Sequence, residues 1–332
     1  MSTRPHVDGV LVQWGERLFY PRNRIVRTAP TPRLSGRIGR RAAAIRRHIQ
    51  ATVVRRAPQV MVKVTGGGRG MAAIAAHFRY ISKSGRLPFE DDRGVIREGK
   101  EAMHDLAEQW RFGGSFIVES SPRREAFNIM LSMPRGTDPL VVQRAAREFA
   151  EAELSDHRYV MVLHDHQANP HVHLSVRAES KHGKRLNPRK ADLQRWRETF
   201  AEKLRGWGID AEATRQRTRG QVRNYEPIWR IKAAAEGRLK TPMRTSRRGQ
   251  GIDRDQTVAA QAWSRIAEGL SQSDSPDDRA LAADVDRFLV NAFAINSKRK
   301  LEVAPEPHNN APTVGQALKP VARDREGPDI RR

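Results

Sequence analysis

Two apolar segments joined by six residues constrain the fold of this 332-residue chain more than any other feature. Residues 158–164 (RYVMVLH) and 171–179 (HVHLSVRAE) each have the pattern of a strand, and DHQANP lies between them. The Asn169-Pro170 pair favours the start of a turn, so the two strands should lie antiparallel. The pattern therefore predicts a β-hairpin at the centre of a larger sheet.

Four of the eleven histidines lie within one ten-residue stretch of this hairpin, residues 164–173. Because side chains alternate across a strand, His171 and His173 share one face, while Val172 and Leu174 face a core on the other. His164 ends the preceding strand, next to the turn. Three imidazoles from two neighbouring strands can then converge on one point and leave positions on a metal ion open for water or substrate oxygens. We interpret His164, His171 and His173 as metal ligands.

Other polar residues near the turn have ordinary explanations. His166 and His157 fit surface or core positions as well as any functional one. Asp165 could accept a hydrogen bond from a ligand imidazole, or it could be a common loop aspartate. Three imidazoles favour a transition metal by softness alone.

Strand and helix patterns alternate through the rest of the central region. Apolar alternation predicts strands in VMVKVT and in EAFNIMLSM, whereas SKSGRLPFEDDRG is typical of a polar loop. Helix patterns cover residues 70–82, 98–111, 138–154 and 188–208. Three or four strands with helices between them predict an α+β fold, with a central, mostly antiparallel sheet flanked by helices.

Basic residues are concentrated on either side of this region. Residues 1–57 have a net charge of +11 and residues 214–250 of +9, against +4 for residues 58–213. A single basic segment is usually a solubilising or disordered tail, but two of them around a histidine cluster favour binding to the phosphate backbone of nucleic acid.

These shifts in composition predict three parts. We expect residues 1–57 to be a mobile Arg/Pro-rich arm with one basic helix at 38–54, and residues 58–220 to form the folded domain. Residues 221–332 should hold a basic linker, short helices near 255–270 and 277–293, and a polar tail. The chain has no cysteine, which excludes disulfides and thiolate metal sites, and it has no apolar run long enough for a membrane span. We expect it in the cytoplasm.

The spacing of the histidines resembles the third motif of the relaxases, the conjugative and mobilisation nickases of the HUH endonuclease superfamily. In that motif two histidines flank a hydrophobic residue on a strand and a third lies seven positions upstream, as do His171, His173 and His164. Many members have Asp two positions after the first histidine, where this chain has His166. The motif therefore does not identify a supporting acid here.

The resemblance implies a nucleophilic tyrosine, and the chain has four: Tyr20, Tyr80, Tyr159 and Tyr225. The first lies in the basic arm, the third has a packing position in a strand, and the fourth is isolated beyond the domain. In the predicted helix Ile74, Phe78 and Ile81 form an apolar stripe, and Tyr80 projects about 120° from Ile74 at about 100° per residue. Geometry alone leaves open a tyrosine at the edge of a helix.

Two further stretches resemble relaxase motifs. GGGRGMAAIAAHFRYISKSG is similar to the first motif, which implies that Tyr80 is the nucleophile; its basic neighbours suit a phosphate, and they are Arg79, Lys83 and Arg86. FNIMLSMPRGTD is similar to the second motif, which implies that Ser132 and Thr137 contact DNA. Thr137 and Asp138 could equally cap the helix that follows.

The likeness extends from about residue 60 to residue 220 and is strongest to the branch that includes the T-DNA border nickases. It implies the HUH relaxase fold, one Mg or Mn ion, and cleavage of one strand at the origin of transfer of a plasmid or integrative element through a 5′-phosphotyrosine. The partners implied are single-stranded DNA, accessory relaxosome proteins and the coupling protein of a type IV secretion system, with export of the protein attached to DNA.

Two other functions fit parts of the pattern. One is a non-catalytic, basic DNA-binding protein with a structural metal. The other is a rolling-circle replication initiator or transposase, but these typically place the tyrosine after the histidines, whereas Tyr80 precedes them. The sequence does not identify the origin, the element served or the oligomeric state.

Overall fold

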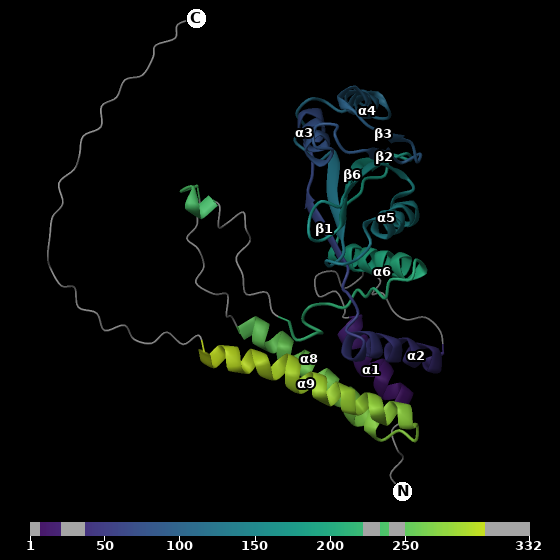
Figure 1. Ribbon diagram of the computed structural model, residues 1–332, viewed down its shortest axis with the longest axis vertical. Coiled ribbons are helices and arrows are strands. Elements are labelled where there is room, and N and C mark those ends of the chain that lie inside the picture. Colours follow the sequence, from purple (N-terminus) through teal and green to yellow (C-terminus); the bar gives the residue numbers. More distant parts are fainter. Residues whose placement is uncertain (1–6, 21–36, 222–232, 239–249, 303–332) are drawn as a thin grey trace, which may run out of the picture.

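The computed structural model describes residues 7–20, 37–221, 233–238 and 250–302 (Figure 1). Its centre is a six-stranded sheet with the order β1-β4-β6-β5-β2-β3, and every pair of neighbouring strands is antiparallel. The strands are β1 (Met61–Gly66), β2 (Phe89–Asp91), β3 (Ile96–Arg97), β4 (Ala126–Ser132), β5 (His157–His164) and β6 (His171–Ser180).

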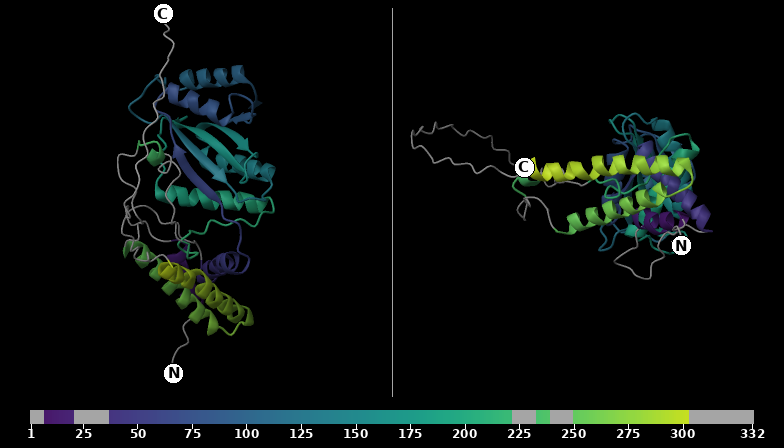
Figure 2. Two further views of the ribbon diagram at one scale, coloured as in Figure 1. Left: turned by 60° about the vertical axis from the view of Figure 1, so that its left-hand side comes forward. Right: turned by 90° about the horizontal axis from the view of Figure 1, so that it is seen from below.

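Helices cover both faces of this sheet (Figure 2). α3 (Met71–Ile81) and α4 (Lys100–Phe112) pack on one face, and α5 (Pro139–Leu154) and α6 (Lys190–Gly206) pack on the other. The predicted α+β fold, with an antiparallel sheet between helices, is confirmed.

The predicted β5–β6 hairpin is present, and its register aligns the histidines. His164 lies directly opposite His171 across the strand pair. Val172, Leu174 and Val176 are fully buried in the core beneath α5 and α6, as the alternation predicts. The histidine face is also covered, because α3 lies over it, so the hairpin is buried on both sides.

Residues 82–94, expected to be a polar loop, contain part of a short hairpin formed by β2 and β3. Two of its acidic residues, Glu90 and Asp91, are buried because they are paired. Glu90 accepts two hydrogen bonds from Arg147 at 2.6 and 2.7 Å, and Asp91 lies 2.9 Å from Arg93. β2 also pairs with β5, which provides hydrogen-bond partners for its backbone. This long-range pairing could not be predicted from the local sequence.

A second group of helices, here called the helical unit, has its own hydrophobic core. It consists of α1 (Val7–Phe19), α2 (Ile38–Ile49), the π-helical turn η1 (Gln50–Val54), α8 (Gln250–Ser271) and α9 (Pro276–Glu302). Trp263, Leu11 and Ile45 are all fully buried in it. The expected helices near 38–54, 255–270 and 277–293 are therefore present, but the described parts of residues 1–57 are helical and packed rather than a mobile arm.

The many arginines of the N-terminal segment suggested a mobile arm, but some of them pair with acidic residues of the other helices. Arg46 of α2 donates to Asp8 of α1 at 2.8 Å and makes a two-pronged contact to Asp278 of α9 at 2.8 and 2.9 Å. Charged groups that pair between helices tie the segment to residues more than 200 positions away. The domain boundaries predicted from composition stay a prediction.

The helical unit meets the sheet domain through the segment that follows α6. His48 lies 3.0 Å from Glu212, Thr52 bonds to Thr214 at 3.1 Å, and the Trp263 indole donates to the Thr218 carbonyl at 2.7 Å. Tyr225 and the polar tail lie outside the described residues. None of the described helices has the length and apolar character needed to cross a membrane.

Candidate functional site

The three histidines predicted as ligands converge at the turn of the β5–β6 hairpin. One ring nitrogen from each of His164, His171 and His173 lies within 4.8 Å of the others. The ring centroids are 4.6 to 5.1 Å apart, and all three side chains are buried. Two adjacent strands thus bring together the group that we call the histidine trio.

Backbone carbonyls fix two of these rings. His164 Nε2 lies 2.6 Å from the Ile81 carbonyl and His171 Nδ1 lies 2.9 Å from the Asn169 carbonyl. Because a carbonyl only accepts, each of these nitrogens must carry the proton, which leaves a lone pair on His164 Nδ1 and on His171 Nε2.

Burial favours the neutral form of two of these rings, His164 and His173. It lowers the pKa of His164, and it lowers the pKa of His173 to about 3. His164 Nδ1 and His173 Nδ1 are buried with no hydrogen-bond partner among the described residues. Neutral imidazoles with unused lone pairs are the form that binds a divalent metal, so the trio fits such an ion.

Asp165 is exposed on the turn, and no hydrogen bond or ion pair to the trio is found for it within the described part of the chain. The orienting role considered for this carboxylate is filled by the two carbonyls. His166 is also exposed, with its ring centroid 5.1 Å from that of His164.

Tyr80 approaches the trio from α3. Its ring centroid lies 6.2 Å from that of His173, and 69% of the residue is exposed. Ile74, Phe78 and Ile81 are at most 1% exposed, so the predicted apolar stripe holds the helix against the sheet and leaves the tyrosine at the flank of the helix, next to His173. An accessible phenol therefore lies beside a buried metal-binding cluster.

The chain turns sharply just after Tyr80. Lys83, Ser84 and Gly85 have φ angles of 51°, 61° and 82°, a run of left-handed residues. A Cβ on Gly85 would lie 2.6 Å from the backbone of Gly99, so a larger residue cannot replace it without a shift. Local strain of this kind is concentrated at functional sites, and here it ends the helix where the Ile81 carbonyl reaches His164.

The basic side chains near Tyr80 are accessible. Arg79 and Arg86 are exposed and Lys83 is half-buried. Arg86 donates from Nε to the Lys83 carbonyl at 3.0 Å.

The other described tyrosines lie elsewhere. Tyr159 is 5% exposed in the core beneath α5, and burial raises its pKa to about 12, which confirms it as a packing residue. Tyr20, which the sequence placed in the basic arm, lies in the helical unit with its hydroxyl 2.8 Å from His48 Nε2.

Ser132 and Thr137 both have partners within the protein. Ser132 lies opposite His171 on β4 and donates to the Pro170 carbonyl at 3.3 Å, so it supports the turn that carries the trio. Thr137 donates to the Pro134 carbonyl at 3.0 Å, whereas Asp138 caps α5 by accepting from the Leu140 amide. The capping alternative therefore holds for Asp138.

His77 is a site residue that the sequence reasoning missed. Its ring centroid lies 6.2 Å from that of Tyr80 and 6.4 Å from that of His173. Its Nε2 is buried with no partner in the described structure, and burial lowers its pKa to about 4. Its position three residues before Tyr80 could have identified it, because residues three apart lie on the same side of a helix.

Comparison with known families gives one match. Residues 94–209 match the family model described as relaxase, MobA/VirD2-like, nuclease domain. The matched range contains the trio, Ser132 and Thr137, and it begins after Tyr80. The curated proteins gave no match.

Proposed function

We propose, because residues 94–209 match the MobA/VirD2-like relaxase nuclease domain, that this protein is a relaxase that nicks one DNA strand at the origin of transfer of a plasmid or integrative element. The observation that carries this proposal is the exposed Tyr80 ring, 6.2 Å from the His173 ring of a buried histidine trio. A nucleophile and a metal-binding cluster side by side are what a metal-assisted phosphoryl transfer needs.

His164, His171 and His173 would hold one divalent ion, which we take to be Mg or Mn as in the family. When bound, such an ion neutralises charge that builds up on the phosphate oxygens. The chain's own contribution is to fix the rings in advance, since the carbonyls of Ile81 and Asn169 set the ring orientations of His164 and His171.

Tyr80 would attack the phosphorus in line. The bond from its oxygen to phosphorus forms as the bond from phosphorus to the 3′ oxygen breaks, and the phenol proton is transferred overall to that oxygen. The products are a 5′-phosphotyrosine and a 3′-hydroxyl, and the phosphotyrosine retains the energy needed to rejoin the strand. Arg79, Lys83 and Arg86 supply positive charge for the phosphate backbone around the cleavage point.

We further propose that the protein accompanies the cut strand in conjugative transfer. Accessory relaxosome proteins would act with it at the origin in the bacterial cytoplasm, and the coupling protein of a type IV secretion system would receive it with the DNA attached. The C-terminal segment expected to be recognised by the coupling protein lies outside the described residues.

The test is Tyr80→Phe, which keeps the ring but removes the oxygen that would bond to phosphorus. The parent should form a protein–DNA adduct at the 5′ side of the break that survives boiling in detergent, and it should nick supercoiled plasmid carrying the origin. The variant should fold, bind single-stranded DNA and bind Mn as the parent does, yet form no adduct.

The matched controls are Phe substitutions at the other three tyrosines, Tyr20, Tyr159 and Tyr225, which should leave the adduct intact. An adduct formed by Tyr80→Phe would show that the nucleophile is another residue. Absence of any adduct from the parent at its own origin would overturn the nickase and favour a non-catalytic DNA-binding protein.

A further inference from the structure

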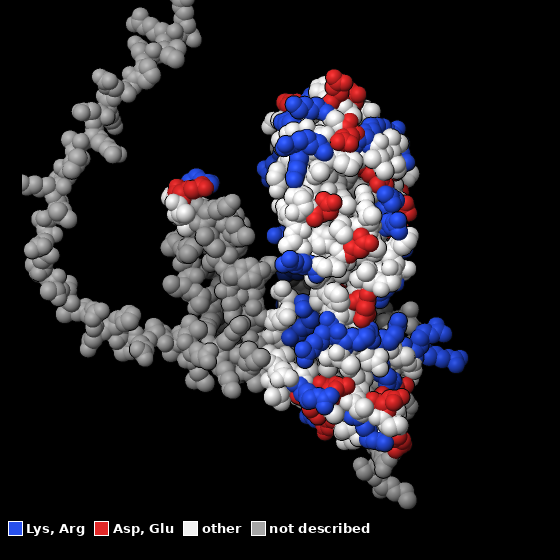
Figure 3. Space-filling view, viewed as in Figure 1, with Lys and Arg blue, Asp and Glu red and all other residues white. Residues whose placement is uncertain are grey.

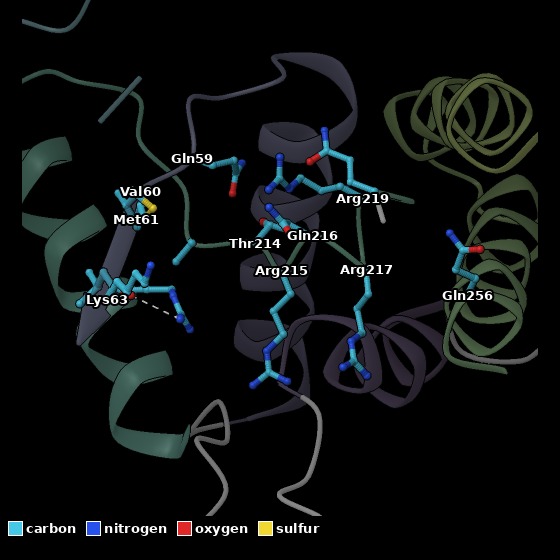
Figure 4. Close-up of a pocket in the computed structure, with 14 residues that line it drawn as sticks. Gln59, Val60, Met61, Lys63, Thr214, Arg215, Gln216, Arg217, Arg219 and Gln256 are labelled. Carbon is cyan, nitrogen blue, oxygen red and sulfur yellow. Dashed lines mark hydrogen bonds between the residues drawn. The ribbon is translucent and has the colours of Figure 1, made fainter. Parts of the chain in front are cut away.

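A pocket of about 620 Å³ lies at the junction of the sheet domain and the helical unit (Figure 4). Its walls are the edge strand β1, part of α6, the segment of residues 213–221 and Gln256 of α8. The segment and α8 lie beyond residues 94–209, so this pocket extends past the part of the chain that matches the relaxase model.

The lining of the pocket is strongly basic. Five of its residues carry a positive charge and none is an Asp or Glu; the five are Lys63, Arg197, Arg215, Arg217 and Arg219. Arg215 and Arg217 extend side by side from one segment, with Gln256 across from them (Figure 4). Guanidinium groups gathered without carboxylates make a site for an anion.

Two arginines of this pocket donate to neutral groups of the protein. Arg215 donates from Nε to Gln194 at 3.2 Å and Arg197 donates to the Val62 carbonyl at 3.4 Å, both neutral acceptors. Arg219 Nε is buried with no partner among the described residues, and so is Gln256 Nε2. Two buried donors and one buried acceptor, Gln59 Oε1, are thus left without a partner at the pocket within the described part of the chain.

Burial of these guanidiniums is unfavourable in the absence of an anion. It lowers the pKa of Arg197, Arg215 and Arg219, and repulsion from Arg217 and Arg197 adds to the effect at Arg215. A charged group held in this way costs free energy until an oppositely charged partner meets it. An oxyanion with several acceptor oxygens would supply that partner.

The pocket is connected to the histidine trio by the sheet. Lys63 on β1 lies opposite Met130, which lies opposite His173. Directly opposed residues point to the same face, so Lys63 and the trio share a face, and two strand spacings separate their backbones by about 10 Å. Figure 3 also shows Lys and Arg gathered in a band across the middle of the molecule, where the sheet domain meets the helical unit.

We propose that this pocket binds a phosphodiester group of the single-stranded DNA whose neighbouring phosphate lies at the trio. The proposal rests on the proposed function for the identity of the strand. The pocket then acts as a second point of attachment, which fixes the strand relative to Tyr80 and requires that the helical unit be in place.

The test measures binding of fluorescent oligothymidylates of 6 and 30 nucleotides in a Tyr80→Phe background, which excludes covalent capture. Arg215→Gln/Arg219→Gln should weaken binding of the long strand at least tenfold. Its log–log salt dependence should fall by about 1.4, because each lost contact to a single strand accounts for about 0.7. The 6-nucleotide strand is also long enough to reach two points about 10 Å apart, so its affinity should fall by a similar factor, and an unchanged affinity would count against the pocket.

Arg195→Gln/Arg265→Gln is the matched control. It also removes two positive charges, one from α6 and one from α8, at exposed positions where the arginines pair with Glu153 and Glu268. It should change binding less than twofold. An equal loss of DNA affinity in the two variants would show that only the net charge matters, and it would overturn the proposal that the pocket binds DNA.

Thermal unfolding separates a ligand site from a structural cluster. Without DNA the pocket variant should melt at the same temperature as the parent or higher, because it removes two charges that burial disfavours. A lower melting temperature than that of the control would assign the arginines a structural role and overturn the proposal.

Two further probes test the ligand. The first is inorganic pyrophosphate. If it raises the melting temperature of the parent and the pocket variant keeps its affinity for the long strand, the pocket binds a small anion instead. The second is oligouridylate. If its binding falls more than that of oligothymidylate in the pocket variant, the pocket binds RNA instead. Adduct formation by the parent is measured separately, so failure of the nickase and failure of the pocket give different results.

Discussion

The histidine trio and the basic pocket both contain nitrogen-bearing side chains that burial desolvates, but they require opposite ligands. Burial lowers the pKa of the His173 imidazole to about 3, so this ring is neutral at pH 7 and offers a lone pair. Burial also lowers the pKa of Arg215, but a guanidinium begins near 12.5 and stays protonated. The same desolvation therefore makes a cation site from imidazoles and an anion site from guanidiniums.

The two sites also differ in what holds them. The trio lies on adjacent strands and is fixed by carbonyls of two nearby turns, those of Ile81 and Asn169. The pocket lies between two folding units, and residues 213–221 form one of its walls. The first site should survive changes in the helical unit, whereas the second should not.

The largest effect is expected from substitutions that remove two ligands of the histidine trio. His171→Ala/His173→Ala leaves one imidazole, which cannot hold a divalent ion in place, so Mn affinity should fall more than about a hundredfold and nicking should cease. Titration calorimetry with Mn measures the affinity. Binding of long oligothymidylate should persist through the pocket, and unchanged Mn binding would show that the trio is not the metal site.

Salt should separate the two sites. Three to five phosphate contacts to a single strand predict a loss of DNA affinity of about 10- to 100-fold between 50 and 200 mM salt. The trio binds through neutral lone pairs, so its Mn affinity should change less than about threefold over the same range. Anisotropy and calorimetry on one preparation measure both, and equal sensitivity would mean that DNA binding does not depend on the basic pocket.

Acid should affect the imidazoles and leave the guanidiniums unchanged. The pKa of His77 is lowered from about 6.5 in the unfolded chain to about 4 by burial. Between those values the unfolded state binds more protons, so stability is complete above about pH 6.5 and falls as the pH is lowered towards 4.

His77→Gln should therefore reduce the loss of melting temperature between pH 7 and pH 5. The expected change is about 2–4 °C, which corresponds to about 1 kcal/mol after allowance for the partial exposure of the ring. The exposed His104 on α4 provides the control, and His104→Gln should leave the pH dependence unchanged. An equal effect of both substitutions would exclude burial as the cause.

The sequence predicted the sheet and the trio because both depend on local periodicity. Alternation in β5 and β6 assigns His171 and His173 to one face and Val172 to the core, and the structure confirms this arrangement. The spacing of Ile74 and Phe78 likewise placed Tyr80 off the buried stripe of α3, where it is exposed. Short-range patterns of this kind need no knowledge of the rest of the chain.

Contacts between distant segments were not predictable in the same way. The β2–β3 hairpin depends on the pairing of Glu90 with Arg147, 57 residues away, and the packing of α2 depends on Asp278. Composition suggested a mobile arm in residues 1–57, yet its helices share a core with Trp263. Deletion of that segment would remove part of this core and would not test phosphate binding alone.

The smallest expected effect concerns His166, which decides whether the trio is complete. Its ring lies 5.1 Å from that of His164, close enough to suggest a fourth ligand, but it is exposed and lies outside the cluster whose nitrogens converge within 4.8 Å. An exposed ring must lose side-chain freedom and water to reach the ion, so it adds little to three rings already buried beside one another. His166→Ala should therefore change Mn affinity and nicking less than about threefold. Calorimetry on this variant beside His171→Ala makes the comparison direct, and a loss as large as that of His171→Ala would move His166 into the metal site.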